Sequence, residues 1–163
     1  MSSPALVVFD LDFTLWDCGG TWCDCLTPPF RVHGGRVLDR NDRHVRLYDC
    51  VDDILNHCEH LSIPYAIASR TEQPGWARNL LDLLEITHRF AFAEIYPSSK
   101  LQHFSSLRDV SGFDFREMLF FDDEMRNIRE VSGLGVTSIF VENGITPAVF
   151  HDALQEYSVR RAS

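Results

Sequence analysis

Residues 5–16 read ALVVFDLDFTLW, and this stretch decides the fold. It begins as an apolar run with the length of a buried strand, which we predict at residues 6–11. Two aspartates, Asp10 and Asp12, interrupt that run. Burying an ionised carboxylate costs several kcal/mol unless a partner compensates its charge. A buried strand that ends in two carboxylates therefore predicts a cation beside them.

The composition of the chain is typical of a single globular domain. The chain has 163 residues, of which 45% are hydrophobic and 24% are charged, close to the average of soluble proteins. We therefore predict one domain over residues 1–163. No apolar run reaches the roughly 18 residues that span a bilayer, and the first strand begins too early for a signal peptide. We expect no membrane partner and a cytoplasmic location.

The formal net charge of −9 argues against a nucleic-acid partner, which would require clustered Lys and Arg. The basic residues are scattered, apart from Arg160 and Arg161 in what we expect to be a short polar tail. Such a chain can bind an anion only by local means, namely a metal, a single Lys or backbone N–H groups.

The five cysteines are interpreted as free thiols. Cys18, Cys23 and Cys25 share one loop-like stretch, and Cys50 and Cys58 fall in a predicted helix. A zinc site in the sequence CGGTWCDC would need a paired CxxC or HxxxH to complete four ligands, and the chain has neither. Free thiols suit a reducing cytosol.

Apolar runs of strand length alternate with helical patterns along the chain. Strands are predicted at residues 6–11, 65–68, 91–95, 118–121 and 137–141. Helices are predicted at residues 51–61, 76–86, 101–110 and 128–134. This alternation predicts an α/β fold, Rossmann-like and doubly wound, whose mainly parallel sheet is covered on both faces.

Residues 17–48 break the alternation and predict a small β-rich insertion, called the flap here. The segment VHGGRVL at 32–38 is typical of two short strands around a Gly-Gly turn, and RHVRLY at 43–48 continues the pattern. The flap is too small to be a second domain, so we expect an open site. Trp16, Trp22 and Phe30 either line its mouth or pack beneath their own loop.

Polar residues gather where the predicted strands end. Ligands of parallel α/β sheets bind beyond the carboxyl ends of the strands. The residues at these ends are Asp10, Asp12 and Thr14, then Ser69, Arg70 and Thr71, then Lys100, and then Asp122, Asp123 and Glu124. Mg²⁺ prefers oxygen ligands, and no His or Cys lies there to favour a softer metal. We predict Mg²⁺ on Asp10, Asp123 and the backbone carbonyl of Asp12, with Asp122 as a ligand or a supporting partner.

Ser69 and Lys100 predict a phosphoryl site beside that metal. Ser69 precedes a predicted helix, so its hydroxyl and the nearby N–H groups are expected to face an anion. Lys100 begins another helix, where a lysine is unfavourable unless an anion lies in between. A serine alone is usually a cap and a lysine alone is usually solvated, so only the joint arrangement carries this prediction.

The same residues resemble a known family. The segment 10–14 (DLDFT), Ser69, Lys100 and the Asp122-Asp123 pair resemble, in order, the four motifs of the haloacid dehalogenase (HAD) superfamily. The segments VFDLDFTLW, PPF, ASRT, EIYPSSK, HF and FFDDEMRNI are similar to the eukaryotic-type magnesium-dependent phosphatases within it.

The resemblance implies a Mg²⁺-dependent phosphomonoester hydrolase with an aspartyl-phosphate intermediate. Asp10 would be the nucleophile, kept ionised by Lys100 and the metal, and Asp12 would be the general acid and base. Thr14 would fix the loop. The implied substrate-binding residues are Leu11, Asp12, Ser69, Arg70 and Lys100, and the implied metal ligands are Asp10, Asp12, Asp122 and Asp123. Arg70 is either a substrate contact or a solvated arginine. The open site expected from the small flap suits a phosphorylated small molecule such as a phosphosugar, or a phosphoprotein side chain such as phosphotyrosine.

Two other classes of function are alternatives to a phosphatase. A signalling receiver domain shares the parallel sheet, acids, hydroxyl, lysine and Mg²⁺, but lacks sustained turnover. Its acidic pair follows the first strand, whereas Asp122 and Asp123 follow the fourth. A catalytically silent binding module is the second alternative, and the complete set of acids argues against it because binding alone does not require them. The carboxylate of Asp12 also separates phosphatases from the dehalogenases and phosphate-coupled pumps, which lack it.

Overall fold

A computed structural model describes residues 2–163, which contain a five-stranded parallel sheet. Its order is β7-β6-β1-β8-β9. The strands are β1 (Leu6–Phe9), β6 (Tyr65–Ser69), β7 (Phe92–Ile95), β8 (Met118–Asp122) and β9 (Thr137–Phe140). From the central β1 the chain adds strands first on one side and then on the other, which is the doubly wound arrangement. The predicted fold class is confirmed.

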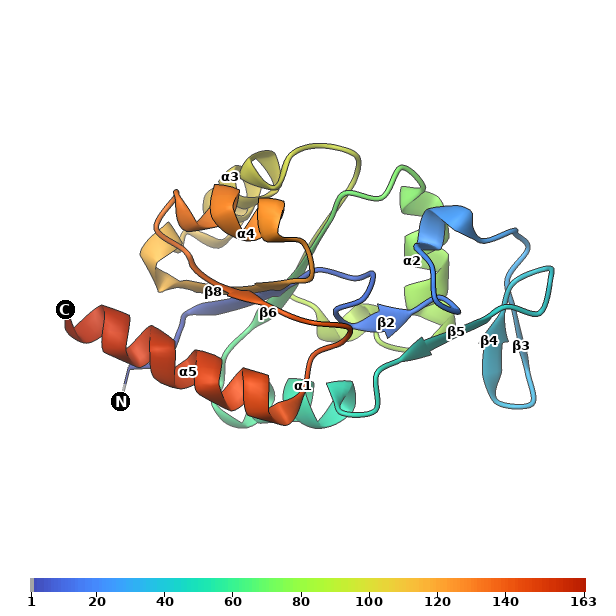
Figure 1. The fold of residues 1–163 in the computed structure, drawn as a ribbon, viewed down its shortest axis with the longest axis horizontal. Coiled ribbons are helices and arrows are strands. Elements are labelled where there is room, and N and C mark those ends of the chain that lie inside the picture. Colours follow the sequence, from blue (N-terminus) through green and yellow to red (C-terminus); the bar gives the residue numbers. More distant parts are fainter. Residues whose placement is uncertain (1) are drawn as a thin grey trace.

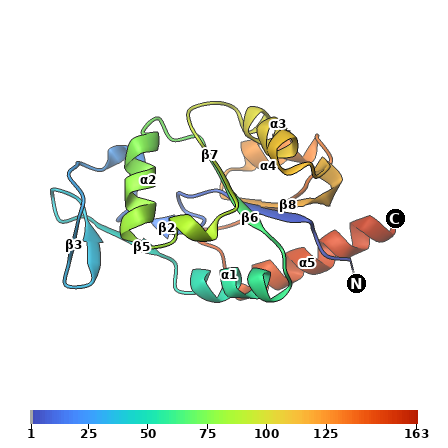
Figure 2. The ribbon, with the colours of Figure 1, turned by 180° about the vertical axis from the view of Figure 1, so that it is seen from behind.

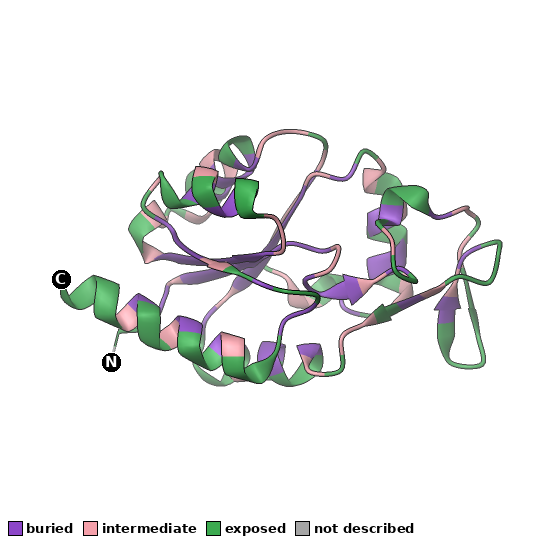
Figure 3. Cartoon of the chain, in the orientation of Figure 1, coloured by how far each residue is buried: buried purple, intermediate pink, exposed green. Residues whose placement is uncertain are grey.

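Helices cover both faces of this sheet (Figures 1 and 2). The helices are α1 (Val51–His60), α2 (Pro74–Leu83), α3 (Lys100–Ser111), α4 (Met125–Ser132) and α5 (Pro147–Ala162), with short 3-10 turns at Cys23–Cys25, Thr87–Arg89 and Phe115–Glu117. Side chains alternate along β1, so that Val7 and Phe9 join the core with α1, α2 and α5, whereas Leu6 and Val8 join the core with α3 and α4. Figure 3 shows the buried strands between helices whose outer faces are exposed.

The flap forms a second, four-stranded sheet of order β2-β5-β4-β3. Its strands are β2 (Trp16–Asp17), β3 (Arg31–His33), β4 (Arg36–Leu38) and β5 (His44–Leu47). The predicted hairpin around Gly34-Gly35 and the third strand after it are confirmed. The division of the chain into one domain at 1–163 with a flap at 17–48 stays a prediction.

The prediction of a short polar tail is wrong, because Arg160 and Arg161 lie in the last turn of α5. The side chain of Thr146 accepts a hydrogen bond from the Val149 N–H at the start of this helix, and Pro147 follows it. Few of its side chains are buried, namely Phe150, Ala153 and Tyr157. The apolar stripe is therefore weak in the sequence, and packing on the sheet stabilises the helix. Within residues 2–163, no helix is both long and apolar enough to cross a membrane.

Candidate active site

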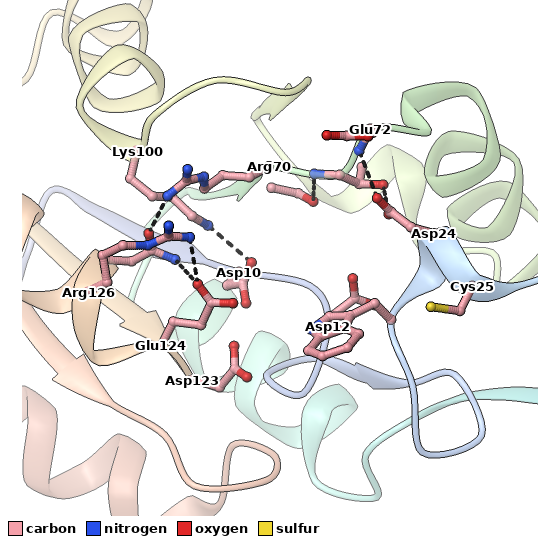
Figure 4. A pocket seen from close by; sticks show the side chains of 14 residues that line it. Asp10, Asp12, Asp24, Cys25, Arg70, Glu72, Lys100, Asp123, Glu124 and Arg126 are labelled. Atoms are coloured by element: carbon pink, nitrogen blue, oxygen red, sulfur yellow. Dashed lines mark hydrogen bonds and ion pairs between the residues drawn. The ribbon is translucent and has the colours of Figure 1, made fainter.

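A pocket of about 320 Å³ lies at the carboxyl ends of β1, β6 and β8 and at the start of α3 (Figure 4). Its lining comprises Asp10, Asp12, Trp22, Asp24, Cys25, Ser69, Arg70, Thr71, Glu72, Lys100, Asp123, Glu124, Arg126 and Asn127. The fold thus brings most of the predicted site residues together. Two are not in the lining, since Leu11 is buried in the core and Asp122 is buried behind the pocket. A role for Leu11 in substrate binding stays a prediction.

Three carboxylates cluster at this end of the sheet, and a lysine contacts two of them. One oxygen each of Asp10, Asp122 and Asp123 lies within 4.8 Å of the others. The Lys100 Nζ is 3.1 Å from Asp10 Oδ1 and 3.1 Å from Asp122 Oδ2, and it donates to the carbonyl of Ala68. Lys100 and Asp122 are fully buried. One ammonium cannot balance three carboxylates, so the cluster has an excess of negative charge.

Burial dominates the pKa values in this cluster. Burial, and next the charge of Asp122, raise the pKa of Asp10 well above its ordinary value, and Lys100 lowers it by less. Burial likewise raises the pKa of Asp123 to about 6. Lys100 alone does not offset the effect of burial on this pKa, and the expectation that Lys100 and the metal together keep Asp10 ionised stays a prediction. The all-oxygen donor set and its uncompensated charge fit a hard divalent cation, which would lower both pKa values.

Asp122 has the contacts of a supporting residue. Its Oδ1 accepts from the Glu124 N–H at 2.8 Å, and its Oδ2 accepts from Asn127 Nδ2 and Lys100 Nζ, each at 3.1 Å. Both oxygens are thus occupied by the protein. Of the two roles predicted for Asp122, these contacts favour the supporting partner over the direct ligand.

The carboxylate of Asp12 is held by the first turn of the flap region. Its Oδ1 accepts from Trp16 Nε1 at 2.8 Å and from the Cys23 N–H at 3.0 Å, and the Cys18 thiol lies at 3.6 Å. Burial raises the pKa of Asp12 to about 6 against the opposing effect of these bonds. Figure 4 shows Asp12 on the opposite side of Asp10 from Lys100. Asp12 is thus a separate carboxyl group, oriented by the flap and able to exchange a proton near pH 6.

The turn that carries these acids is fixed by the segment after β9. The backbone N–H groups of Gly144 and Ile145 donate to the carbonyls of Phe13 and Thr14 at 2.8 and 3.0 Å. The Thr14 hydroxyl donates to Asp10 Oδ2 at 3.4 Å, consistent with its expected part in fixing the loop. Phe13 has a φ of 60°, a conformation that is rare for a bulky residue. These bonds compensate that strain and hold the two acids in place.

The loop after β6 differs in part from its predicted role. The N–H of Thr71 donates to the Ser69 hydroxyl at 3.4 Å, and the N–H of Gln73 donates to Thr71 Oγ1 at 3.0 Å. Asp24 of the flap accepts from the Thr71 hydroxyl and, at 3.1 Å, from the Glu72 N–H. The protein itself therefore satisfies the backbone N–H groups of Thr71, Glu72 and Gln73. An anion here would contact the side chains of Ser69 and Arg70 instead.

Of the three aromatic residues considered for the mouth, Trp22 lines the pocket and is 52% exposed. Its ring meets that of Phe13 edge-on at 6.0 Å between centroids. Trp16 is fully buried, and Phe30 packs against Trp76 at 6.1 Å. The latter two are therefore not in the pocket lining, and Phe30 packs on α2.

The cysteines give no sign of a metal site. All five are free, and burial raises the pKa of Cys23 to about 12. Over the described part of the chain, the one cluster of metal-ligating side chains is that of Asp10, Asp122 and Asp123.

Several polar residues of the pocket lining were missed from the sequence, namely Asp24, Glu72, Arg126 and Asn127. Asn127 lies one helical turn after Asp123, so helical spacing could have placed it back at the end of β8. Asp24 had no comparable signal, because its partners Thr71 and Glu72 are far away in the sequence.

His103 leads to a prediction about stability. It is fully buried in α3, and its Nε2 contacts the Tyr96 carbonyl at 2.9 Å, while no described residue partners its Nδ1. Burial lowers its pKa to about 4. The unfolded chain, with a His pKa near 6.5, then binds more protons below that pH, so acid favours unfolding. We expect this residue to cost roughly 2 kcal/mol of unfolding free energy between pH 7 and pH 4.5.

Urea unfolding of the wild type and His103→Gln at both pH values measures this cost. The wild type should lose more stability than the variant on acidification. Equal losses in the two proteins would show that His103 does not titrate in this window.

Comparisons with known proteins agree with this geometry. A profile of the Acid Phosphatase family matches residues 2–160. Magnesium-dependent phosphatase 1 of Homo sapiens is 43% identical over 157 residues, which cover 95% of this chain and 88% of that protein. A HAD-like hydrolase superfamily protein of Schizosaccharomyces pombe is 37% identical over 147 residues, covering 82% of this chain and 83% of its own.

The fold comparison gives the same result at lower sequence identity. The solved structure of a haloacid dehalogenase-like hydrolase from Streptococcus pneumoniae superposes with a TM-score of 0.65 at 14% identity, covering 94% of this chain and 92% of that one. The resemblance stated from the motifs is thereby confirmed. The chain belongs to the Acid Phosphatase family of the HAD-like hydrolase superfamily.

Proposed function

We propose that the chain is a Mg²⁺-dependent phosphomonoester hydrolase that acts through an aspartyl-phosphate. The observation that carries the proposal is the pairing of Asp10 with Lys100 beside a second, separately held acid, Asp12. The names of relatives support the metal, since the human relative is a magnesium-dependent phosphatase.

The chemistry follows from the positions of these side chains. An Asp10 oxygen bonds to phosphorus as the bond from phosphorus to the ester oxygen breaks, and Asp12 gives its proton to the leaving oxygen. Asp12 then takes a proton from water, whose oxygen attacks the phosphorus. Asp10 is released as a carboxylate together with inorganic phosphate. Asp12 suits both steps, because the flap holds one of its oxygens and its pKa is about 6.

The remaining residues bind and orient the phosphoryl group. Ser69, Arg70 and Lys100 offer one hydroxyl and two cationic groups to the same pocket. Asp10, Asp123 and the backbone carbonyl of Asp12 would hold Mg²⁺, with Asp122 as the supporting partner. When bound, the metal supplies positive charge that offsets the repulsion between these carboxylates and the phosphoryl oxygens.

The substrate class is part of the proposal. The pocket opens to solvent beside Trp22 and Cys25, which are both exposed. This opening favours a phosphosugar or a phosphotyrosine side chain that is held by its phosphate. Five free thiols favour a reducing compartment such as the cytoplasm. A screen of phosphosugars, phosphotyrosine and nucleotides tests the substrate class.

The receiver alternative has less support than a phosphatase. A receiver requires no general acid beside its phosphorylated aspartate, whereas three groups around the start of the flap orient Asp12. Sustained turnover of p-nitrophenyl phosphate would exclude a receiver, which would become phosphorylated and stop.

Removing the metal should abolish this turnover. We expect none in excess chelator and full recovery with added Mg²⁺, because the charge of the carboxylate cluster is then uncompensated. Asp123→Asn should raise the Mg²⁺ concentration for half-maximal activity by about tenfold or more. Glu142→Gln, a change at an exposed residue just after β9, is the matched control and should leave it unchanged. Wild-type activity in excess chelator would contradict the proposed metal.

A further inference from the structure

Asn127 connects three charged side chains that come from different parts of the site. It lies in the first turn of α4 and is 3% exposed. Its Oδ1 accepts from Arg70 Nη1 at 3.0 Å, and its Nδ2 donates to Asp122 Oδ2 at 3.1 Å and to Glu124 Oε2 at 3.3 Å. Arg70 is 57 positions away in the sequence. The amide thus joins the loop after β6 to the end of β8.

The neighbours of this amide fix its orientation. Ionised carboxylates only accept hydrogen bonds and a guanidinium only donates them, so the NH₂ must face Asp122 and Glu124 and the oxygen must face Arg70. Only an amide offers an acceptor and two donors on one planar group. An Asp of the same shape would place a third carboxylate beside Asp122 and Glu124, and a Leu would make none of these bonds.

The cations of the pocket differ in how they are compensated. Lys100 is paired with Asp10 and Asp122, and Arg126 is paired with Glu124 at 3.2 Å. Arg70 has no carboxylate within ion-pair distance among residues 2–163, although it lines the same pocket. The group that fixes its guanidinium is the neutral amide of Asn127. The positive charge of Arg70 therefore stays available to an incoming anion.

We propose that Asn127 is a positioning residue that presents Arg70, held but not neutralised, to the phosphoryl group of the substrate. This inference rests on the proposed function and adds a residue that acts through Arg70. A charged hydrogen bond that holds the guanidinium contributes to phosphate binding through Arg70. The bond to Asp122 ties the same amide to the Lys100 pair, so the phosphate contact and the nucleophile share one support.

Three variants test the proposal by steady-state kinetics with p-nitrophenyl phosphate and by inhibition with inorganic phosphate. Asn127→Leu should raise both the KM and the phosphate inhibition constant by about 10- to 100-fold. Asn127→Asp keeps the shape of the side chain and still holds the guanidinium of Arg70. Because its carboxylate neutralises the charge of Arg70, this variant should nevertheless raise the KM and the phosphate inhibition constant by about tenfold. Ile128→Val, a neighbouring buried change in α4 without polar contacts, is the control and should leave both within about twofold.

A double-mutant cycle with Arg70→Ala separates positioning from a general loss of structure. If Asn127 acts through Arg70, Asn127→Leu should change KM and the phosphate constant by less than about threefold once Arg70 is absent. Independent, multiplying effects would overturn the proposal. So would an Asn127→Asp enzyme with wild-type constants, and this variant preserves side-chain volume should the Leu variant not fold.

The failure of the proposed function has a different signature. Wild-type protein that turns over no phosphomonoester would refute the phosphatase itself. The Arg70–Asn127 proposal would then still be tested by calorimetric titration of inorganic phosphate into the same variants with Mg²⁺ present.

Discussion

Asp10→Asn should lower the turnover of p-nitrophenyl phosphate by about 10⁴-fold or more, the largest effect expected of any single substitution in this chain. An amide is a very poor nucleophile toward phosphorus, and the change also removes one partner of the buried Lys100. Because Asn has nearly the shape of Asp, the fold should survive, which circular dichroism and thermal unfolding can check.

Chemical trapping completes this prediction. Acid-quenched wild-type enzyme should carry a phosphoryl group that hydroxylamine releases, as expected of an acyl phosphate, and Asp10→Asn should carry none. Asp109→Asn, an exposed carboxylate in α3, is the matched control and should behave as the wild type. Wild-type rates in Asp10→Asn would mean that water attacks the phosphorus directly and that Asp10 serves only the metal.

Asp12→Asn should lower steady-state turnover by about 10²- to 10⁴-fold while the fold and the metal site persist. Trp16 Nε1 and the Cys23 N–H can still donate to the Oδ1 of an asparagine, so the side chain should keep its place. What it loses is the proton that leaves with the ester oxygen and the base that activates water.

The leaving group should separate these two roles of Asp12. p-Nitrophenolate leaves without protonation, so Asp12→Asn should form the phospho-enzyme with this substrate and then accumulate it. An alkyl phosphate, whose oxygen needs the proton, should give little phospho-enzyme. Unimpaired steady-state turnover of both substrates would remove Asp12 from the mechanism.

The sequence was sufficient for the central sheet because its inner strands β6, β1 and β8 are buried on both faces. Continuous apolar runs such as 6–9 and 118–121 are typical of such strands, and their ends carried the acids, the serine and the lysine. α5 was missed for the opposite reason. Three buried side chains on a 16-residue helix leave little periodicity, and contacts with a distant sheet decide its structure.

The contacts that tune the site could not be predicted from local patterns. Asp12 depends on Trp16 and Cys23, Thr71 depends on Asp24, and Arg70 depends on Asn127. Apart from the local bond between Asp12 and Trp16, these bonds join residues that come together only when the flap or α4 is placed beside the sheet. The raised pKa of Asp10 could not be predicted either. Burial affects this pKa more than Lys100 does, and the sequence motif does not show how deeply Asp10 is buried.

The outer hairpin of the flap has a practical consequence for measurement. β3 and β4 contribute no residue to the described pocket lining, and space is open around Gly34 and Gly35 at the tip. The same small sheet continues through β5 to β2, whose Trp16 holds Asp12. A fluorophore or spin label at this tip would therefore be connected through one sheet to Asp12, the proposed general acid, without entering the pocket, so the hairpin offers a labelling position for observing the flap while a substrate binds.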